Sequence, residues 1–538
     1  MRVKTTPSEI WSEYKEISAY LSKYDIYETV KQNELFFEGK QWEDLEDSDL
    51  PTPVINVLQR SGLWDIASLN SNDIACSITP YSNMEEDVER MSVISDAVEQ
   101  VIEKTKTKEF SRIVTRNAFV DGSCFTMQSF DPEIDTNQIA QGDIKNEIID
   151  NTNMYFGNPN SMDIQGQPWI IVSFRQHIDL VREEAEERNI DINDIRSDNE
   201  KLQVNDDSDK LVTVLIKYWK QKEKIKAKQV MTDPMTNKRF EVEYEKTVRT
   251  VWFTKTTEKV TIIPPTRLGY RRYPIAHMPW HFRKNSYQGI SPMTSSITNQ
   301  VFINKSFALG MMYSEQNALP KLVYDRTKTD IEDIMNSQIV GTTNIDMMGK
   351  VLDFIKSPDF SNQIIELARE TIGQTKDSLG VTDAALGNVK PENTSAIITL
   401  QESSSIPLEI QKQYYFDYWE DTIRNFLDIM TVKYGKRYIM SEGNGLSFVD
   451  FSSLQNLNYN LQVEIGAGAQ YSQVAQINTL DKYLQGGLIP GSLHAKLMPN
   501  KYLLGKNEII KEMENREAMA MQPDMPQVGA QSIVPSNQ

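Results

Sequence analysis

Two long helical patterns that enclose a short module constrain the fold of this chain more than any other feature. The first pattern opens at Ser291-Pro292 and continues for about 27 residues, or roughly 40 Å. The second begins at 357–359 and ends at Gly380. Apolar residues recur at helical spacing in both, namely Ile297, Val301, Ala308 and Met312 in the first and Ile364, Ala368 and Ile372 in the second. A projecting helix pair cannot bury both stripes alone, so we expect them to pack against another subunit.

The enclosed module and the segment after the second helix have their own signals. Short strand patterns at 322–324 and 351–354 flank a small predicted helix near Asp330. Residues 381–393 read as a loop, and a long helix follows from 394 to about 434. Because Pro407 removes a backbone donor, we expect a kink in that helix.

The remaining sequence predicts an α+β fold. Thr6, Pro7 and Glu9 form a helix start, and further helices are predicted at 25–37 and 85–104. A period near two predicts strands at 123–128, 144–149 and 169–174, and further β-rich runs lie at 211–219 and 247–254. The last two are spaced as a long hairpin with a basic loop, 220–228, near its tip, and the acidic residues 182–210 predict a solvated helix plus a mobile loop. Towards the C-terminus we expect strands at 446–448 and 461–465, helices at 472–484 and 506–519, and disorder at 521–538.

The charge and composition exclude several classes of protein. Lys and Arg number 57 against 76 Asp and Glu, so the net charge is 57 − 76 = −19. A protein that coats duplex DNA by its overall charge needs the opposite balance. No apolar run approaches the roughly 18 to 20 residues that span a bilayer, and the start of the chain lacks the apolar region of a secretory signal. We therefore expect a protein made and used without export, in which Cys76 and Cys124 are small core residues.

No catalytic or cofactor-binding pattern stands out. None of the four Gly-Lys pairs belongs to a phosphate-binding loop. His277 and His281 have the spacing of a helical zinc site, but Pro279 lies between them, and the Gly-Ile-Ser-Pro motif at 289–292 reads as a turn into a helix rather than a nucleophile elbow. Bases and aromatic residues alternate at 267–284, which suits either single-stranded nucleic acid or, more simply, a basic loop over an aromatic core. We expect no enzyme activity, no metal and no cofactor.

The order helix, small module, helix, loop and long kinked helix resembles the portal proteins of tailed bacteriophages. Further similarities lie in the Phe-Glu-Gly-Lys-Gln-Trp run at 37–42 with Pro-Val-Ile-Asn at 53–56, and in the segment 154–170. The motifs at 289–292, 385–388 and 393–396 match the entry to the first stem helix and the tunnel-loop region. The family often has Asp where Asn158 stands, and the resemblance spans about 6–515.

This resemblance implies a specific division of the chain. The expected parts are an N-terminal mixed α/β wing at 1–290, stem helix 1 at 291–319, a small α/β clip at 320–357, stem helix 2 at 358–380, a tunnel loop at 381–396, the long kinked helix and C-terminal wing at 397–470, a helical crown at 471–520 and a disordered tail at 521–538.

The resemblance also implies a function. Portal proteins form a ring, usually a dodecamer, at one capsid vertex, through which double-stranded DNA is packaged and ejected. The implied partners are the major capsid protein, the large subunit of the terminase motor, and head-completion adaptor and tail proteins, with transient contact to the DNA. The implied location is the portal vertex of the virion, after assembly in the host cytoplasm. An acidic channel suits this role because it lets a polyanion slide without trapping it.

Individual residues acquire candidate roles from the same resemblance, each with a plainer alternative. In the tunnel loop the candidates for DNA contact are Asn388, Lys390, Asn393 and Thr394, although Lys390 reads equally well as an ordinary exposed lysine. Channel-lining stem candidates are Lys356, Arg369 and Lys376, which could equally form salt bridges between subunits. Candidates for docking through the clip are Asp325, Arg326, Lys328, Asp330, Glu332 and Asp333, for which a solvated surface is the alternative.

Three other functions remain open at this point. A head–tail adaptor or other ring-forming virion protein would also assemble into a ring, but such chains are usually much shorter. A DNA-processing enzyme is disfavoured because no catalytic constellation is visible. A soluble multidomain scaffold would be favoured by a chain that forms no ring.

Overall fold

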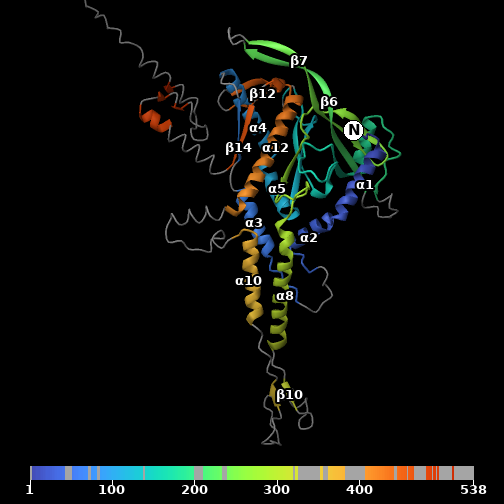
Figure 1. Cartoon of the computed structure of the whole chain (residues 1–538), viewed down its shortest axis with the longest axis vertical. Coiled ribbons are helices and arrows are strands. Elements are labelled where there is room, and N and C mark those ends of the chain that lie inside the picture. Colours follow the sequence, from blue (N-terminus) through green and yellow to red (C-terminus); the bar gives the residue numbers. More distant parts are fainter. Residues whose placement is uncertain are drawn as a thin grey trace, which may run out of the picture.

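The computed structural model shows an α/β body from which two helices project (Figure 1). The residues that it describes are 3–42, 51–70, 74–80, 85–136, 138, 140–198, 210–232, 239–318, 322–324, 352–354, 362–381, 406–441, 445–456, 459–465, 480–486, 489–491, 494–495 and 512–513. None of the helices in these ranges is long and apolar enough to cross a membrane.

Three helices open the chain. Helix α1, Pro7–Lys23, starts with the predicted capping box, in which the Glu9 carboxylate accepts from both the Thr6 amide and hydroxyl. Helix α2, Ile26–Glu38, ends at Gly39, whose φ of 91° is a conformation that glycine adopts at low cost. Helix α3, Val57–Leu69, was not predicted, and the side chain of Asn56 caps it by accepting from Gln59 N.

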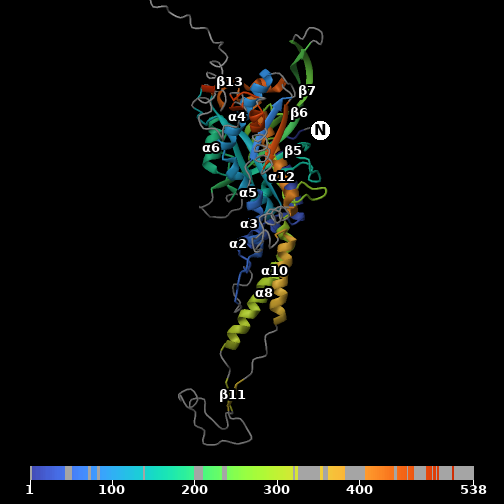
Figure 2. The same ribbon diagram turned by 90° about the vertical axis from the view of Figure 1, so that its left-hand side faces the viewer.

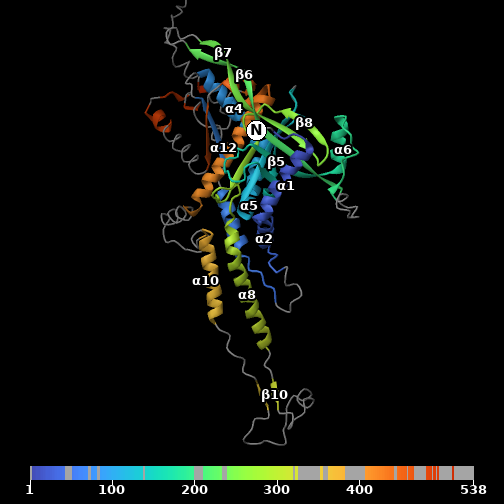
Figure 3. The same ribbon diagram turned by 45° about the vertical axis from the view of Figure 1, so that its right-hand side comes forward.

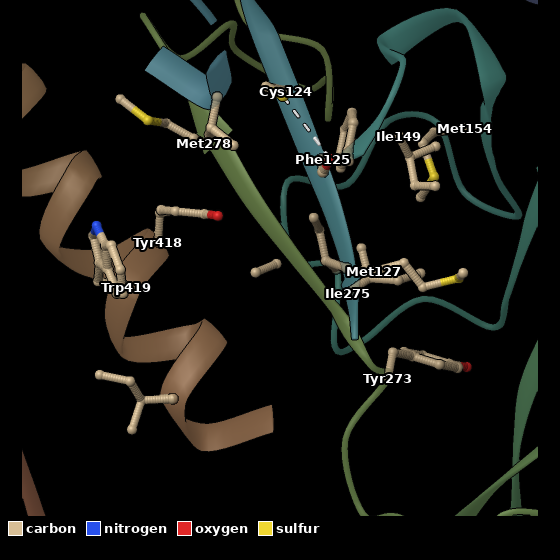
Figure 4. Packing of buried hydrophobic residues seen from close by; sticks show 14 of the residues in the cluster. Cys124, Phe125, Met127, Ile149, Met154, Tyr273, Ile275, Met278, Tyr418 and Trp419 are labelled. Carbon is tan, nitrogen blue, oxygen red and sulfur yellow. Dashed lines mark hydrogen bonds between the residues drawn. The ribbon is translucent and has the colours of Figure 1, made fainter. Parts of the chain in front are cut away.

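A three-stranded antiparallel sheet occupies the centre of the body. Its order is β3-β2-β9, with β2 at Ser123–Asp131, β3 at Asp143–Ile149 and β9 at Ile275–Pro279. Helix α5, Thr107–Asp121, precedes β2, and helix α12, Glu409–Lys433, packs across the sheet. Figure 4 shows Tyr418 and Trp419 of α12 beside strands β2 and β9. The main hydrophobic core therefore joins strands and a helix that lie almost 300 positions apart in the sequence.

A second, five-stranded antiparallel sheet lies beside the first. Its order is β4-β5-β6-β7-β8, and its strands are Met154–Phe156, Trp169–His177, Leu211–Thr232, Arg239–Thr256 and Thr261–Arg267. The long hairpin was predicted correctly, but residues 220–228 are strand rather than loop, because β6 continues through them in register with β7. Helix α6, Ile178–Glu187, covers the start of β6 and has a small hydrophobic core of its own.

The C-terminal part of the chain returns to elements near the N-terminus. Strand β14, Tyr459–Ile465, pairs with β1, Ile74–Pro80, and helix α4, Glu85–Lys104, packs against β1. Strands β12, Lys436–Ser441, and β13, Gly445–Asp450, form a hairpin that also contacts α4. Short 3₁₀ turns lie at Asn151–Asn153, Ile406–Leu408 and Phe451–Asn456.

The two projecting helices are α8, Pro292–Ala318, and α10, Asn362–Ser378. They project from the body in the same direction and contact each other (Figures 1 and 3). Strands β10, Leu322–Tyr324, and β11, Leu352–Phe354, pair antiparallel beyond their ends, where the sequence predicted two short strands.

The predicted α+β class is confirmed. The predicted kink at Pro407 takes a different form, because Pro407 lies in the 3₁₀ turn just before α12 begins at Glu409. The preceding residues 394–405, the small helix near Asp330, the helix at 506–519 apart from 512–513, and the tail at 521–538 lie outside the described residues.

Candidate functional site

The projecting pair of α8 and α10, hereafter the helix pair, is the feature that sets this chain apart from an ordinary globular protein. Its function depends on how firmly the body holds it and on which side chains it exposes. Helix α8 begins at Pro292, as the turn motif at 289–292 predicts.

The root of α8 is packed tightly into the body. The Ser291 hydroxyl donates to Phe119 O (2.7 Å) and accepts from Met293 N (3.1 Å), so Ser291 caps α8 and ties it to α5. Gly289 N donates to Ser123 Oγ (2.7 Å), and a Cβ at Gly289 would lie 2.0 Å from Gly122 O. Only glycine fits here, which fixes the direction in which α8 leaves the body.

The two histidines near this root do not form a metal site. Strand β9 carries His277, whose Nε2 lies 3.1 Å from Ser123 Oγ and whose ring stacks on Phe125 at 4.5 Å between centroids. Burial lowers the pKa of His277 to about 3, so the ring is neutral. His281 lies beyond the end of β9 beside Gln411, with 3.4 Å between Nδ1 and the Gln411 amide nitrogen. Among the described residues, no group of three or more metal-ligating side chains is present.

Buried amides hold the first half of α8 to the segment that leads into α3. Gln300 Nε2 donates to Ile55 O (2.6 Å), and Gln300 Oε1 accepts from Val57 N (3.0 Å). One turn later, Asn304 Oδ1 accepts from Ile55 N (3.3 Å) and Asn304 Nδ2 donates to Gln41 Oε1 (2.5 Å). Val57 N also donates to Ile55 O (2.9 Å), so the two side chains add partners to the backbone groups of this turn. These side-chain bonds fix α8 as far as Asn304.

The hydrogen bonds that Gln300 and Asn304 make with Gln41 and with residues 55–57 are hereafter called the amide clamp. They were not predicted from the sequence, because only the apolar positions of this helix were considered. The available signal was the four-residue spacing of Ser296, Gln300 and Asn304, all of which are buried. Polar residues at that spacing normally indicate a solvated helix face. Only the contact with residues 55–57 shows that they are internal.

The single chain covers much of the predicted apolar stripes by itself, which differs from the expectation that the helix pair needs another subunit to bury them. Ile297, Ala308 and Ala368 are buried, and Val301, Met312, Ile364 and Ile372 are half-buried. Asn299 Nδ2 of α8 also donates to Thr375 Oγ1 of α10 (3.2 Å), which joins the two helices across their shared face.

A different set of apolar side chains is left exposed on the helix pair. Its members are between 37% and 51% exposed, and they are Phe302, Leu309, Met311, Ile365 and Leu367. None of them belongs to the predicted stripes. Five large apolar side chains on a thin projection are more than a single chain in water normally presents, and they indicate a protein–protein contact.

Of the charged and polar residues predicted to contact DNA or partner proteins, only Arg369 and Lys376 lie within the part of the chain that the structure describes. Arg369 is exposed on α10. Lys376 is half-buried, and its carbonyl accepts from the amides of Leu379 and Val381 at the end of α10. The candidates that lie outside the described residues are Lys356, Asn388, Lys390, Asn393, Thr394, Asp325, Arg326, Lys328, Asp330, Glu332 and Asp333.

The segment 267–284 has a basic loop over an aromatic core, which was the simpler of the two interpretations of its sequence. Tyr273 and Trp280 are buried in the core. The Arg271 and Arg272 amides both donate to Asp428 Oδ2, at 2.7 and 2.9 Å, and the Arg272 guanidinium pairs with Asp421. These bonds anchor the loop to α12.

Comparison with known proteins agrees with the architecture. The family model described as "Phage P22-like portal protein" matches residues 14–430, which include most of the body, the helix pair and most of α12. No curated protein matches the chain. Since the match covers more than three quarters of the 538 residues, the chain belongs to the P22-like family of phage portal proteins.

Proposed function

We propose that this protein forms a closed ring of about twelve subunits at one vertex of a phage capsid, and that double-stranded DNA enters and leaves the capsid through its central channel. Membership of the portal family gives the structural role in the phage head. The observation that carries the ring is the helix pair, whose exposed apolar side chains need a covering surface. Identical neighbours in a ring supply that surface without any further protein.

The arrangement of the chain supports a division of labour within this ring. The helix pair would serve as the stem, and residues 320–357 as the clip that docks the large terminase subunit and later the head-completion and tail proteins. The body would serve as the wing that contacts the major capsid protein, and residues 471–520 as the crown. The protein would assemble in the host cytoplasm and remain at the portal vertex of the virion.

The charge of the chain suits a channel through which DNA must move. Twelve chains of net charge −19 repel a polyanion except where bases are concentrated. The residues proposed to meet the DNA are Asn388, Lys390, Asn393 and Thr394 in the tunnel loop, with Lys356, Arg369 and Lys376 on or beside the second stem helix.

The mass and symmetry of the purified protein test the ring directly. Native mass spectrometry is expected to show one species of about twelve subunits, and end-on electron micrographs are expected to show a central hole. A monomer or dimer at micromolar concentration contradicts the proposal and favours a cellular scaffold protein instead.

The DNA channel needs a second experiment. Lys390→Ala is expected to leave ring formation unchanged but to alter the rate or completeness of packaging with purified terminase and capsids. The matched control is Lys433→Ala, which removes an exposed lysine at the end of α12. Equal packaging by both variants would contradict a role of Lys390 in DNA contact.

A further inference from the structure

The outer part of the β6–β7 hairpin extends beyond the five-stranded sheet. Strand β5 pairs with β6 only as far as Trp219, and β8 pairs with β7 only from Trp252 onward. Residues 221–232 and 239–250, hereafter the ribbon, therefore pair only with each other among the described strands. At about 3.3 Å per residue the ribbon is roughly 40 Å long, and an isolated two-stranded ribbon is marginally stable in water. Its extension calls for a surface on which it rests.

The charges on the ribbon indicate what kind of surface this is. Lys222 lies directly opposite Arg249 in the register, and Lys224 lies opposite Thr247. Because side chains alternate along a strand, Lys222, Lys224 and Arg249 share one face, and all three are exposed. The exposed Glu245 lies on the same face nearer the tip, so the basic part of this face is the part next to the sheet. Like charges directly opposite each other destabilise a strand pair. An anionic surface against this basic face would relieve the repulsion.

The same chain carries such a surface at the other end of β6. Helix α6 packs on the start of β6 through Ile178, Val181 and Ala185, which turns its opposite side to solvent. That side holds four exposed carboxylates, hereafter the acidic face, namely Asp179, Glu183, Glu186 and Glu187. Three and four residues apart on a helix, these like charges repel one another.

The ribbon and the acidic face lie on opposite sides of the subunit. Figure 2 shows α6 at the left of the body and the ribbon at its upper right, with the helix pair running downward below them. In a ring, the contact between neighbours joins two different and opposite sides of the same chain. When the basic side of one subunit faces the acidic side of the next, the same contact can repeat around a closed ring.

We propose that the ribbon of each subunit lies on the acidic face of the next subunit, so that Lys222, Lys224 and Arg249 meet the carboxylates of α6. This inference rests on the proposed ring and names a contact in the body, separate from the helix pair. A basic ribbon could also bind DNA phosphates. We favour the neighbouring subunit as the partner because the same chain carries an exposed acidic face whose charge complements that of the ribbon.

Charge reversal on the two surfaces tests the contact. The reversed ribbon is Lys222→Glu with Lys224→Glu and Arg249→Glu, and the reversed helix is Glu183→Lys with Glu186→Lys and Glu187→Lys. Each set alone is expected to raise the protein concentration for half-maximal ring formation by about tenfold at low salt, as a few exposed ion pairs can. The two sets combined in one chain restore the attraction with opposite signs, and the ring should return to nearly the wild-type concentration. High salt should abolish the differences.

The matched control carries the same change of charge away from the basic face. It is Lys15→Glu with Lys31→Glu and Lys246→Glu; Lys246 lies on the ribbon but points to its other face, opposite Ile225 in the register. This control is expected to assemble like the wild type. Should a reversed variant fail to fold, the pair Lys224→Cys and Glu183→Cys provides a second measurement, in which mild oxidation of the ring should link neighbouring subunits by disulfides.

Each outcome decides between defined alternatives. Normal ring formation by the reversed ribbon, no rescue in the combined variant, or no cross-linking in the cysteine pair would overturn the proposed contact while leaving the ring itself intact. Normal rings with less DNA retained in the capsid would overturn it in favour of DNA binding by the ribbon. Absence of rings in the wild type would instead refute the proposed function, and this contact with it.

Discussion

At the scale of single residues, a buried ionisable side chain makes the stability of the body depend on pH. Asp65 of α3 is 1% exposed, and its Oδ1 accepts no hydrogen bond from the described residues. Desolvation raises its pKa from 3.8 to about 8. The folded chain therefore binds this proton more tightly than the unfolded chain does, and stability is lost as the pH rises from 3.8 to about 8.

Asp65→Asn is expected to remove this pH-dependent cost. Its melting temperature should exceed that of the wild type at pH 8, and the difference should shrink as the pH falls and vanish near pH 3.8. The difference in unfolding free energy is at most about 6 kcal/mol, at about 1.4 kcal/mol for each pKa unit. Thermal melts across this pH range provide the measurement, with the exposed Asp179→Asn as the control. A constant difference at every pH would contradict the assignment.

A second buried ionisable residue, Lys217, joins helix α1 to the five-stranded sheet. Its Nζ lies 2.5 Å from Glu13 Oε2 and 2.9 Å from Lys4 O, and its side chain is 1% exposed. Removing one partner leaves the other charge buried without compensation, so Glu13→Ala should lower the unfolding free energy by roughly 3 to 5 kcal/mol.

The paired change distinguishes this mechanism from simple loss of packing. Glu13→Leu with Lys217→Met removes both charges and should melt close to the wild type, whereas additive destabilisation in the double variant would show that the two charges do not interact. Denaturant unfolding of the wild type, Glu13→Leu, Lys217→Met and the double variant is the measurement, because additivity is judged against both single changes.

At the scale of elements, the direction of α8 depends on the amide clamp. Gln300→Ala removes the bonds from Gln300 to Ile55 O and Val57 N and leaves these two groups only their bond to each other (2.9 Å), at a cost of roughly 1 to 3 kcal/mol for the two lost bonds. Hydrogen exchange should show faster exchange of the Val57 amide, with little change in the central sheet. Gln374→Ala, on the exposed side of α10, is the control. An unchanged Val57 amide would show that the clamp does not hold the segment 55–57.

At the scale of the whole molecule, the exposed apolar side chains of the helix pair link assembly to solubility. Leu309 and Leu367 are 45% and 51% exposed, so replacing both by Asp costs little in the isolated chain. In a ring the same carboxylates would be buried between subunits. We therefore expect Leu309→Asp with Leu367→Asp to abolish ring formation while leaving the melting temperature of the monomer nearly unchanged.

Native mass spectrometry and thermal melts of the same preparations test this expectation. Met162→Asp changes a similarly exposed apolar residue in the body and is the control. Rings in the double variant would show that these two side chains lie outside the subunit interface.

The local elements follow from the sequence alone. The capping residues of α1, the apolar period of α4, the turn that starts α8 and the β-rich runs of β2 and β5 each depend on neighbours a few positions away. Such patterns are readable because helix and strand periods are fixed by backbone geometry. The apolar period of the helix pair was predictable for the same reason, but the extent to which the chain buries it was not.

The relations between distant segments depend instead on tertiary packing. The pairing of β1 with β14, the clamp between Gln300 and residues 55–57, and the exposure of Leu309 and Leu367 depend on how remote parts of the chain pack. The strand character of 220–228 likewise comes from its pairing with β7. No local pattern encodes these contacts, because a polar or apolar side chain acquires its environment only when another element covers it or leaves it in water.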